Sequence, residues 1–368
     1  MQIDFHFTSI YALSRLAGFT KEEAHTIAQS SQFVDDAIHS GIIFFDNRAA
    51  YRMNSAAHKM LDYRNLKELA NHYVWIPFHF IPGNMEETPD ESIASLFVQK
   101  IVCRPNSLIA QKILEKIYRS RDREFSLQLL GVSLHAYADT WAHQGFAGID
   151  HPINQVQGIF EWNEAKPHSH SQRIKNYYAD PWWKKLYSWF LSFFISKTFP
   201  LGHGPVLSLP DRPYMKWRYV DWKGAMIERD NPKEYIEACK HIFSFLVSFR
   251  TGDSFTTNHQ LEPQDLEQLK RLFQSLDMED GHDRYLHWVE EIRTGAFSFG
   301  PESCQYIEPK SGISKIDESE KTIDQIYHDV PYSKDFMDSL WKKNYDAITY
   351  YRTLVLHEVL PEFEICAT

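Results

Sequence analysis

The chain has 368 residues, of which 43% are hydrophobic, and this is enough to bury a substantial core in one or two domains. Lys and Arg number 39 against 49 Asp and Glu, so the formal net charge is −10 at pH 7. This acidic balance argues against a surface that binds duplex nucleic acid through its phosphates, and it favours small or membrane-borne substrates.

The opening residues, MQIDFHFTSIYALSRLAGF, lack the basic start, continuous apolar run and small-residue cleavage site of a secretory signal. The four cysteines lie far apart with no C-x-x-C pair, which indicates neither a disulfide framework nor a thiolate zinc site. We therefore expect a cytoplasmic protein, or one that is exported without a cleavable signal peptide.

Helical spacing of apolar residues dominates the first 130 residues, where strand-like alternation is scarce. Thr20 and Glu23 form a capping box that predicts the start of one helix. The helices expected in this part are 22–39, 93–105 and 107–120. Two later stretches, 144–180 and 200–232, are rich in Gly, Pro, Asn and Asp and are predicted to be ordered loops, which are often functional.

The remainder of the chain returns to helical spacing, apart from a loose linker predicted at 298–325. Further helices are expected at 231–249, 262–293 and 335–363. The predicted fold is therefore mainly α. Residues 1–250 form one helical domain with a loop and aromatic insertion at 144–232, and residues 251–368 form a helical C-terminal region that can pack on the same domain.

One predicted helix carries a column of metal-ligand residues. LHAYADTWAHQG places His135, Asp139 and His143 four residues apart with no helix breaker. Residues so spaced differ by about 40° around the axis and about 6 Å along it, so they share a face over about 12 Å. One zinc ion cannot span that column, but a central carboxylate can bridge two ions about 3.5–4 Å apart.

Other ligand types stand where an apolar residue is expected: His6 in DFHF, Asp35 and Asp36 in SQFVDDA, and His79 in WIPFHFIPG. Burying such groups without a partner costs several kcal/mol, so they are usually paired or metal-bound. A lone histidine on an apolar face is more often a satisfied core or surface residue. We give that interpretation to His25, His58, His72, His241 and His357.

In this order of residues the sequence resembles the superfamily of zinc-dependent phospholipases C and single-strand-specific zinc nucleases, which are all-helical and hold three zinc ions. By that resemblance His6 corresponds to the early ligand, Asp35 or Asp36 to the bridging carboxylate and His79 to the histidine of a His-aromatic motif. His135 and Asp139 correspond to the His-x-x-x-Asp helix pair, and His143 to the ligand that follows it. The implied fold is a multi-helix bundle of phospholipase C or zinc nuclease type.

Longer motifs are similar to an uncharacterised bacterial family that belongs with leaderless bacterial zinc metallophospholipases C. They are DFHFTSIYALSRLAGF, SQFVDDA, WIPFHFIPG, DTWAHQGFAG and GHGPVLSLPDRPY, between residues 4 and 214.

The sequence departs from the superfamily pattern in three places. It starts Met1-Gln2 instead of the Trp whose amine binds zinc, so either Asp4 substitutes or the third ion is absent. The gap from Asp139 to His143 is shorter than usual. The closing His-x-x-x-Glu/Asp pair has no obvious match: His203 in LGHG is the best candidate, and His151, His168, His170 and the pair His287 and Glu291 are weaker ones.

The resemblance implies a phosphodiester hydrolase with two or three zinc ions, most simply a phospholipase C that releases diacylglycerol and a phosphorylated head group. Asp35 or Asp36 would orient or deprotonate the attacking water, and adjacent residues on a helix cannot both face inward. The alternatives are a zinc-dependent single-strand nuclease or other phosphoesterase, and a helical interaction protein with a structural metal. A phosphohydrolase with an adjacent His-Asp pair is less favoured, since His282-Asp283 and His328-Asp329 lie in polar surroundings.

A route to lipid is suggested by the segment 181–199, PWWKKLYSWFLSFFISKTF, which holds three Trp, four Phe and three Lys and is too polar to span a bilayer. Trp182, Trp183, Trp189 and Phe193 could enter a lipid headgroup layer while the lysines meet anionic lipid, giving peripheral membrane contact. A buried core helix or a partner-binding face explains the same residues.

Overall fold

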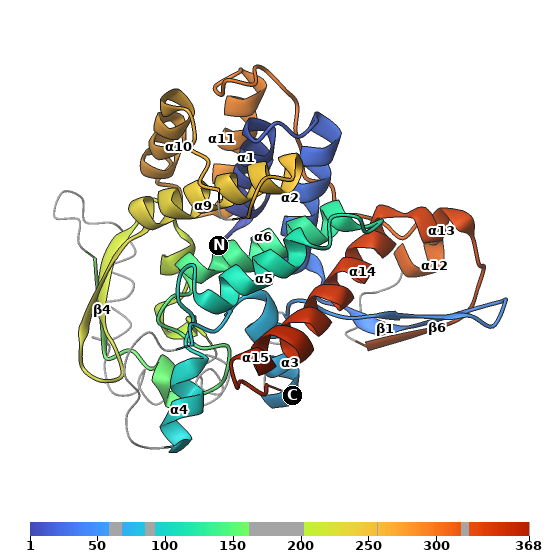
Figure 1. Ribbon diagram of the computed structural model, residues 1–368, viewed down its shortest axis with the longest axis horizontal. Coiled ribbons are helices and arrows are strands. Elements are labelled where there is room, and N and C mark those ends of the chain that lie inside the picture. Colours follow the sequence, from blue (N-terminus) through green and yellow to red (C-terminus); the bar gives the residue numbers. More distant parts are fainter. Residues whose placement is uncertain (59–67, 85–92, 162–201, 256, 318–323, 368) are drawn as a thin grey trace, which may run out of the picture.

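The computed structural model describes residues 1–58, 68–84, 93–161, 202–255, 257–317 and 324–367. A helix buried on every side, α6 (Ser126–Ala142), runs through the middle of the molecule (Figure 1). Every residue of α6 from Gln128 onward is buried: apolar residues occur on all sides of this helix, and its polar residues, His135 and Asp139 among them, are enclosed with them.

Helix α2 (Lys21–Asp36) packs along α6 and begins at the predicted capping box of Thr20 and Glu23. The two helices approach closely at Gly131, where a Cβ atom would lie 2.3 Å from the carbonyl oxygen of Ile27. Only glycine permits this approach. This close approach places the last turn of α2 beside the turn of α6 that follows Gly131.

Other helices surround α6. The π-helical turn η1 (Asp4–Ser9) leads into α1 (Ile10–Leu16), and α9 (Asn231–Thr251) and α14 (Leu340–Thr353) contact α6 directly. Helix α11 (Gly281–Arg293) packs on η1, and α10 (Pro263–Ser275) packs on α9. The remaining helices are α3 (Glu68–Phe78), α4 (Ile93–Lys100), α5 (Leu108–Tyr118), α12 (Ser314–Asp317), α13 (Lys334–Asp338), η6 (Leu354–Val359) and α15 (Leu360–Glu362), with short 3-10 turns η3 (Pro152–Asn154), η4 (Gly204–Val206) and η5 (Leu209–Asp211).

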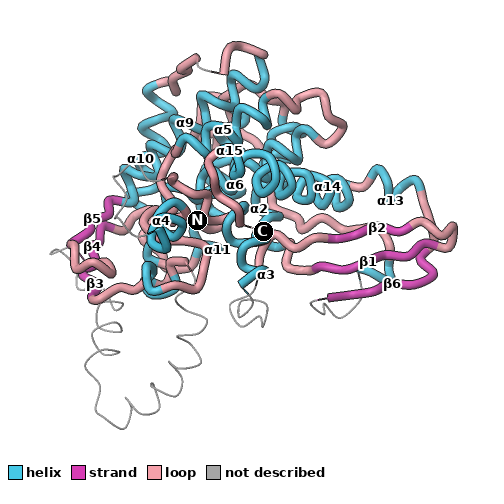
Figure 2. The backbone as a smooth tube through the Cα atoms, turned by 60° about the horizontal axis from the view of Figure 1, so that its bottom comes forward, coloured by secondary structure: helices cyan, strands magenta, loops and turns pink. Residues whose placement is uncertain are grey.

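Two small sheets lie at opposite ends of the molecule (Figure 2). In the first, β1 (Ser40–Phe45) pairs antiparallel with β2 (Ala50–Met53) and parallel with β6 (Asp324–Val330). In the second, β3 (Gly158–Glu161), β4 (Lys216–Val220) and β5 (Met226–Asp230) form an antiparallel meander.

The structure is helix-rich as predicted, but these strands were not predicted. The alternation in β4, where Trp217 and Tyr219 are buried, covers only five residues inside a stretch interpreted as loop. Strand β6 likewise takes in the end of the predicted linker 298–325. Such short strands are defined by the partner strands that they meet, and one-dimensional periodicity does not contain that information.

One hydrophobic core includes buried residues from Met1 to Ala367, so the C-terminal region packs against the same core as the N-terminal half. A smaller cluster around Phe80, Phe146 and Trp217 lies under the second sheet. None of the described helices is both long and apolar enough to cross a bilayer. Segment 181–199, with Trp182, Trp183, Trp189 and Phe193, lies outside the described residues.

Candidate metal centre

Side chains from distant parts of the chain meet around the carboxylate of Asp139, which is 1% exposed. Its Oδ1 lies 3.2 Å from His6 Nε2. Its Oδ2 lies 3.1 Å from His79 Nδ1, 3.4 Å from His135 Nε2 and 3.7 Å from His143 Nδ1. The convergence of His6 and His79 on the α6 column is the geometry that a metal cluster requires.

Within the described residues, three groups of side chains could each hold a metal ion. In each group, the ligand atoms lie within 4.8 Å of one another. They are His6, Asp35 and His135; His79, His135 and Asp139; and His143, His203 and Asp211. The first two groups share His135, and Asp139 lies between all three. The arrangement is therefore one connected centre.

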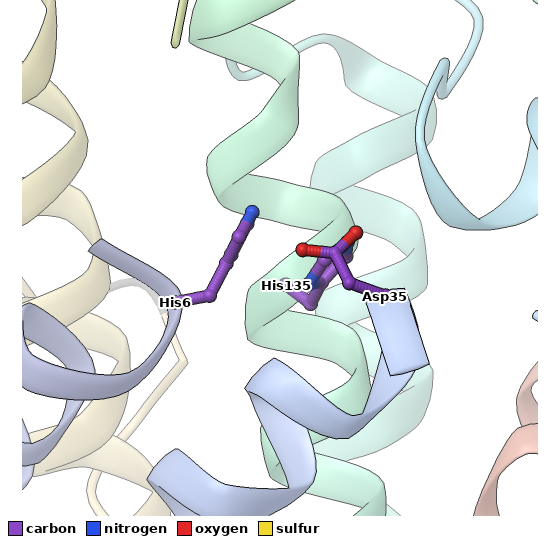
Figure 3. A group of neighbouring side chains, drawn as sticks. All are labelled: His6, Asp35 and His135. Atoms are coloured by element: carbon purple, nitrogen blue, oxygen red, sulfur yellow. The ribbon is translucent and has the colours of Figure 1, made fainter. Parts of the chain in front are cut away.

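The first group joins η1, α2 and α6 (Figure 3). The His6 and His135 rings stack with centroids 3.8 Å apart, and His135 Nε2 lies 3.7 Å from the Asp35 carboxylate. Both ring nitrogens of His6 are buried, and neither makes a hydrogen bond, although Nε2 lies 3.2 Å from Asp139 Oδ1. Orphaned buried nitrogens are costly, and a bound cation would satisfy one of them.

Backbone carbonyls fix the orientation of four histidines. His79 Nε2 donates to the carbonyl of Ala56 at 3.0 Å, and His135 Nδ1 donates to that of Ser31 at 2.9 Å. His143 Nδ1 donates to the carbonyl of His79 at 2.7 Å. His203 Nδ1 donates to that of Leu207 at 2.8 Å.

Because a carbonyl can only accept, each of these rings carries its proton on the outer nitrogen. The other nitrogen presents its lone pair: His79 Nδ1 and His135 Nε2 face the Asp139 carboxylate, whereas His143 Nε2 and His203 Nε2 face that of Asp211. This pattern is typical of metal-binding histidines, whose second nitrogen is held by an outer hydrogen bond.

Asp211, which ends η5, completes the third group: its Oδ1 lies 3.6 Å from His143 Nε2, and its Oδ2 lies 3.8 Å from His203 Nε2. The Asn231 side chain holds this turn by donating to the carbonyls of Leu209 and Arg212, both at 2.7 Å. Asp211 lies within the motif GHGPVLSLPDRPY, and it was not predicted from the sequence as a ligand. The available signal was an acidic residue in an apolar, proline-flanked stretch.

His203 reaches the centre because its loop lies against Phe80. Gly202 has φ +58°, and a Cβ atom there would lie 2.1 Å from the Phe80 ring. The same ring stacks on His143 with centroids 4.6 Å apart. Glycine is therefore required at position 202 both for its backbone conformation and for space.

Arg229 fixes the end of α6 that carries His143. Its Nη2 donates to the carbonyls of Trp141 and Ala142 at 2.9 and 3.1 Å, and its guanidinium pairs with Glu234. A buried cation at this position satisfies the last carbonyls of α6 and complements the helix dipole.

The electrostatics of the centre favour the metal-binding state of three of its histidines and of Asp139. Burial is the main factor that lowers the pKa of His6, His135 and His143 to about 4, so these rings are neutral at neutral pH. Burial alone would raise the pKa of Asp139, but the His143 ring and the Met1 amine more than offset it and hold this pKa well below its usual range. Metals bind neutral imidazole and ionised carboxylate.

The Met1 amine also lies in the centre, 2.7 Å from Asp139 Oδ1 and 3.1 Å from Asp211 Oδ1. Its burial opposes the charged form, but these two carboxylates prevail and raise the amine pKa to about 11. Asp4, considered as a substitute ligand, lies elsewhere, because it forms a buried ion pair with Arg284 at 2.5 Å.

The adjacent carboxylates Asp35 and Asp36 have different surroundings. Asp35 faces the cluster, and burial by the surrounding protein raises its pKa although 34% of its side chain stays exposed. Asp36 accepts a hydrogen bond from the Tyr306 hydroxyl at 2.6 Å, and burial raises its pKa to about 6. Of the two candidates, only Asp35 lies in the centre.

The weaker sequence candidates that are described lie outside these groups. His151 caps η3, His287 is exposed, and Glu291 pairs with Arg271. The pairs His282-Asp283 and His328-Asp329 are exposed. His168 and His170 lie outside the described residues.

A family model described as a family of unknown function, DUF6765, matches residues 1–359. No curated protein and no solved structure matches the chain.

Proposed function

We propose that this chain, which belongs to the DUF6765 family of unknown function, is a zinc-dependent phosphodiester hydrolase of phospholipase C type that cleaves glycerophospholipids to diacylglycerol and a phosphorylated head group. The observation that carries the proposal is the centre around Asp139, in which buried ligand atoms face one another while backbone carbonyls hold the outer side of four histidine rings.

The donor set fits zinc, which binds imidazole nitrogen and carboxylate oxygen readily. The shared ligands favour more than one ion: His79, His135 and Asp139 would hold one, and His143, His203 and Asp211 a second. His6 and Asp35, which neither of these two sets uses, would be available to hold a third ion. Zinc in such a centre supplies hydroxide at neutral pH and neutralises the charge that develops on a phosphoryl group.

Asp35 is the residue best placed to accept a proton from the attacking water. Its carboxylate is partly exposed, whereas that of Asp139 is enclosed, so water can reach Asp35.

The choice of phospholipid rests on the motif resemblance and on the acidic net charge, which disfavours nucleic acid as a substrate. Peripheral membrane contact through 181–199 belongs to the same proposal. The nuclease, another phosphoesterase and a purely structural metal centre are the other outcomes of the test.

The test uses zinc-loaded protein with phosphatidylcholine or phosphatidylglycerol vesicles and, separately, with single-stranded DNA. Asp35→Asn and Asp36→Asn are matched variants, because the same isosteric change falls on neighbouring residues that face different partners. We expect release of soluble phosphorylated head group from vesicles, about 10²–10⁴-fold slower in Asp35→Asn and little changed in Asp36→Asn.

Nucleotide release without head-group release would assign the centre to a nuclease. Neither product from protein with bound zinc would leave a structural metal centre. Equal losses in both variants would remove Asp35 from its proposed role.

A further inference from the structure

An open cavity of about 530 Å³ lies between β2, α3 and α14. Arg52 of β2 and Arg352 in the last turn of α14 both line it. Asn54, Ser55, His58 and Tyr73 contribute hydrogen-bonding groups to the same wall. The cavity contains none of the residues grouped in the metal centre.

The two arginines differ from others in the protein. Arg229 and Arg284 are buried, and each pairs with a carboxylate at 2.7 Å or less. In the described parts of the chain no such pair is formed by Arg52 or Arg352, and no Asp or Glu lines the cavity. Both arginines line the same cavity, and burial together with the neighbouring charge of Arg52 lowers the pKa of Arg352.

The protein holds the Arg352 side chain in place, whereas the Arg52 side chain is exposed at the cavity. The Arg352 guanidinium lies over the Tyr73 ring, with Cζ 5.5 Å from the ring centroid. Asn54 Nδ2 donates to Thr349 Oγ1 at 2.9 Å, which ties the chain just after β2 to α14 one turn before Arg352. One guanidinium packed on a ring and one exposed guanidinium, both on the wall of this cavity, offer several N–H donors to one small anion.

We propose that this cavity binds a phosphate-bearing anion, either a soluble phosphate monoester or the phosphate of a lipid head group. Arginine recognises phosphate through paired N–H···O bonds, which are stronger than neutral hydrogen bonds, and the anion removes the repulsion between the two cations. A ligand with one phosphate is small enough for the volume.

The cavity adjoins the metal centre through two contacts. The carbonyl of Ala56, between Ser55 and His58, accepts the hydrogen bond from His79 Nε2. The Trp75 ring lies 6.2 Å from that of His58 and 5.0 Å from that of His79, measured between centroids. The inference nevertheless rests on the arginines alone and does not require the proposed hydrolysis.

The test is calorimetric titration of the full chain with inorganic phosphate, with and without EDTA, so that binding to metal is separated from binding to the cavity. Arg352→Gln and Arg52→Gln are compared with the matched control Arg293→Gln, whose arginine is 61% exposed on α11. A second arm measures binding to phosphatidylcholine vesicles with and without phosphatidic acid.

We expect each cavity variant to weaken binding about tenfold or more in EDTA, and the control to bind like wild type. A loss seen with inorganic phosphate identifies a soluble phosphate ligand, and a loss confined to phosphatidic acid vesicles identifies a lipid head group. If Arg352→Gln and Arg52→Gln match the control in both arms while their circular dichroism stays native, the proposal is wrong. Head-group release in the zinc assay is unaffected by either result, so the two proposals fail separately.

Discussion

The buried ion pair between Arg284 of α11 and Asp4 of η1 gives the sharpest stability prediction. Both side chains are at most 1% exposed, and Arg284 also donates to the Gln2 side chain and the Met278 carbonyl. Asp4 precedes the candidate ligand His6 by two residues. Arg284→Met therefore leaves the Asp4 carboxylate buried without its partner. It also removes a contact that positions η1.

Breaking a buried pair by removing one partner costs about 3–5 kcal/mol of unfolding free energy. At an unfolding entropy of about 2.1 cal/mol/K per residue, the 368-residue chain should melt about 4–6.5 °C lower. The double variant Asp4→Leu/Arg284→Met leaves no unpaired charge and should recover most of the loss.

The assay is urea and thermal unfolding of the metal-free protein between pH 4 and 8. In Arg284→Met the unpaired Asp4 carboxyl binds a proton more readily in the folded chain than in the unfolded chain. Burial already raises the pKa of Asp4 in the wild-type protein, and loss of Arg284 raises it further. The destabilisation relative to wild type therefore shrinks as the pH falls from the Asp4 pKa of the folded variant toward that of the folded wild type. If the single and double variants lose the same stability at every pH, an uncompensated buried charge is not the cause.

Three further predictions concern the metal centre. Asp139→Asn should lose more than one zinc ion per chain by elemental analysis. The reason is that this carboxylate belongs to the second ligand group and also lies 3.2 Å from His6 of the first and 3.7 Å from His143 of the third. Loss of a single ion would contradict a shared role. Gly131→Ala should lower the unfolding free energy by roughly 1–2 kcal/mol, since overpacking between α2 and α6 outweighs the gain in helix propensity. It should also weaken the zinc affinity measured by calorimetry. Unchanged affinity would show that the spacing of the two helices does not position the ligands. Metal-free protein should melt at lower temperature as the pH falls from 6.5 to about 4, because His6, His135 and His143 bind protons more weakly in the folded chain than in the unfolded chain. Melting temperatures that rise as the pH falls through this range would refute the lowered pKa values.

The sequence alone predicted the helix-rich fold and the ligand column, because both depend on local spacing. The three α6 residues share a face through helix geometry, and the capping box of Thr20 and Glu23 marks a helix start in its own four residues. His6 and His79 were noticeable because each is polar in an apolar frame, which is also visible along the chain.

Only the tertiary structure decided which of two adjacent aspartates faces the centre, since that depends on the rotation of α2 about its axis against α6. It also added Asp211, whose loop is held by Asn231 from α9, and it brought Arg52 and Arg352, 300 positions apart in the numbering, to one cavity. These features depend on contacts between segments distant in the chain. Spacing along a sequence reports the faces of single helices and strands, whereas the packing of those faces determines which residues meet.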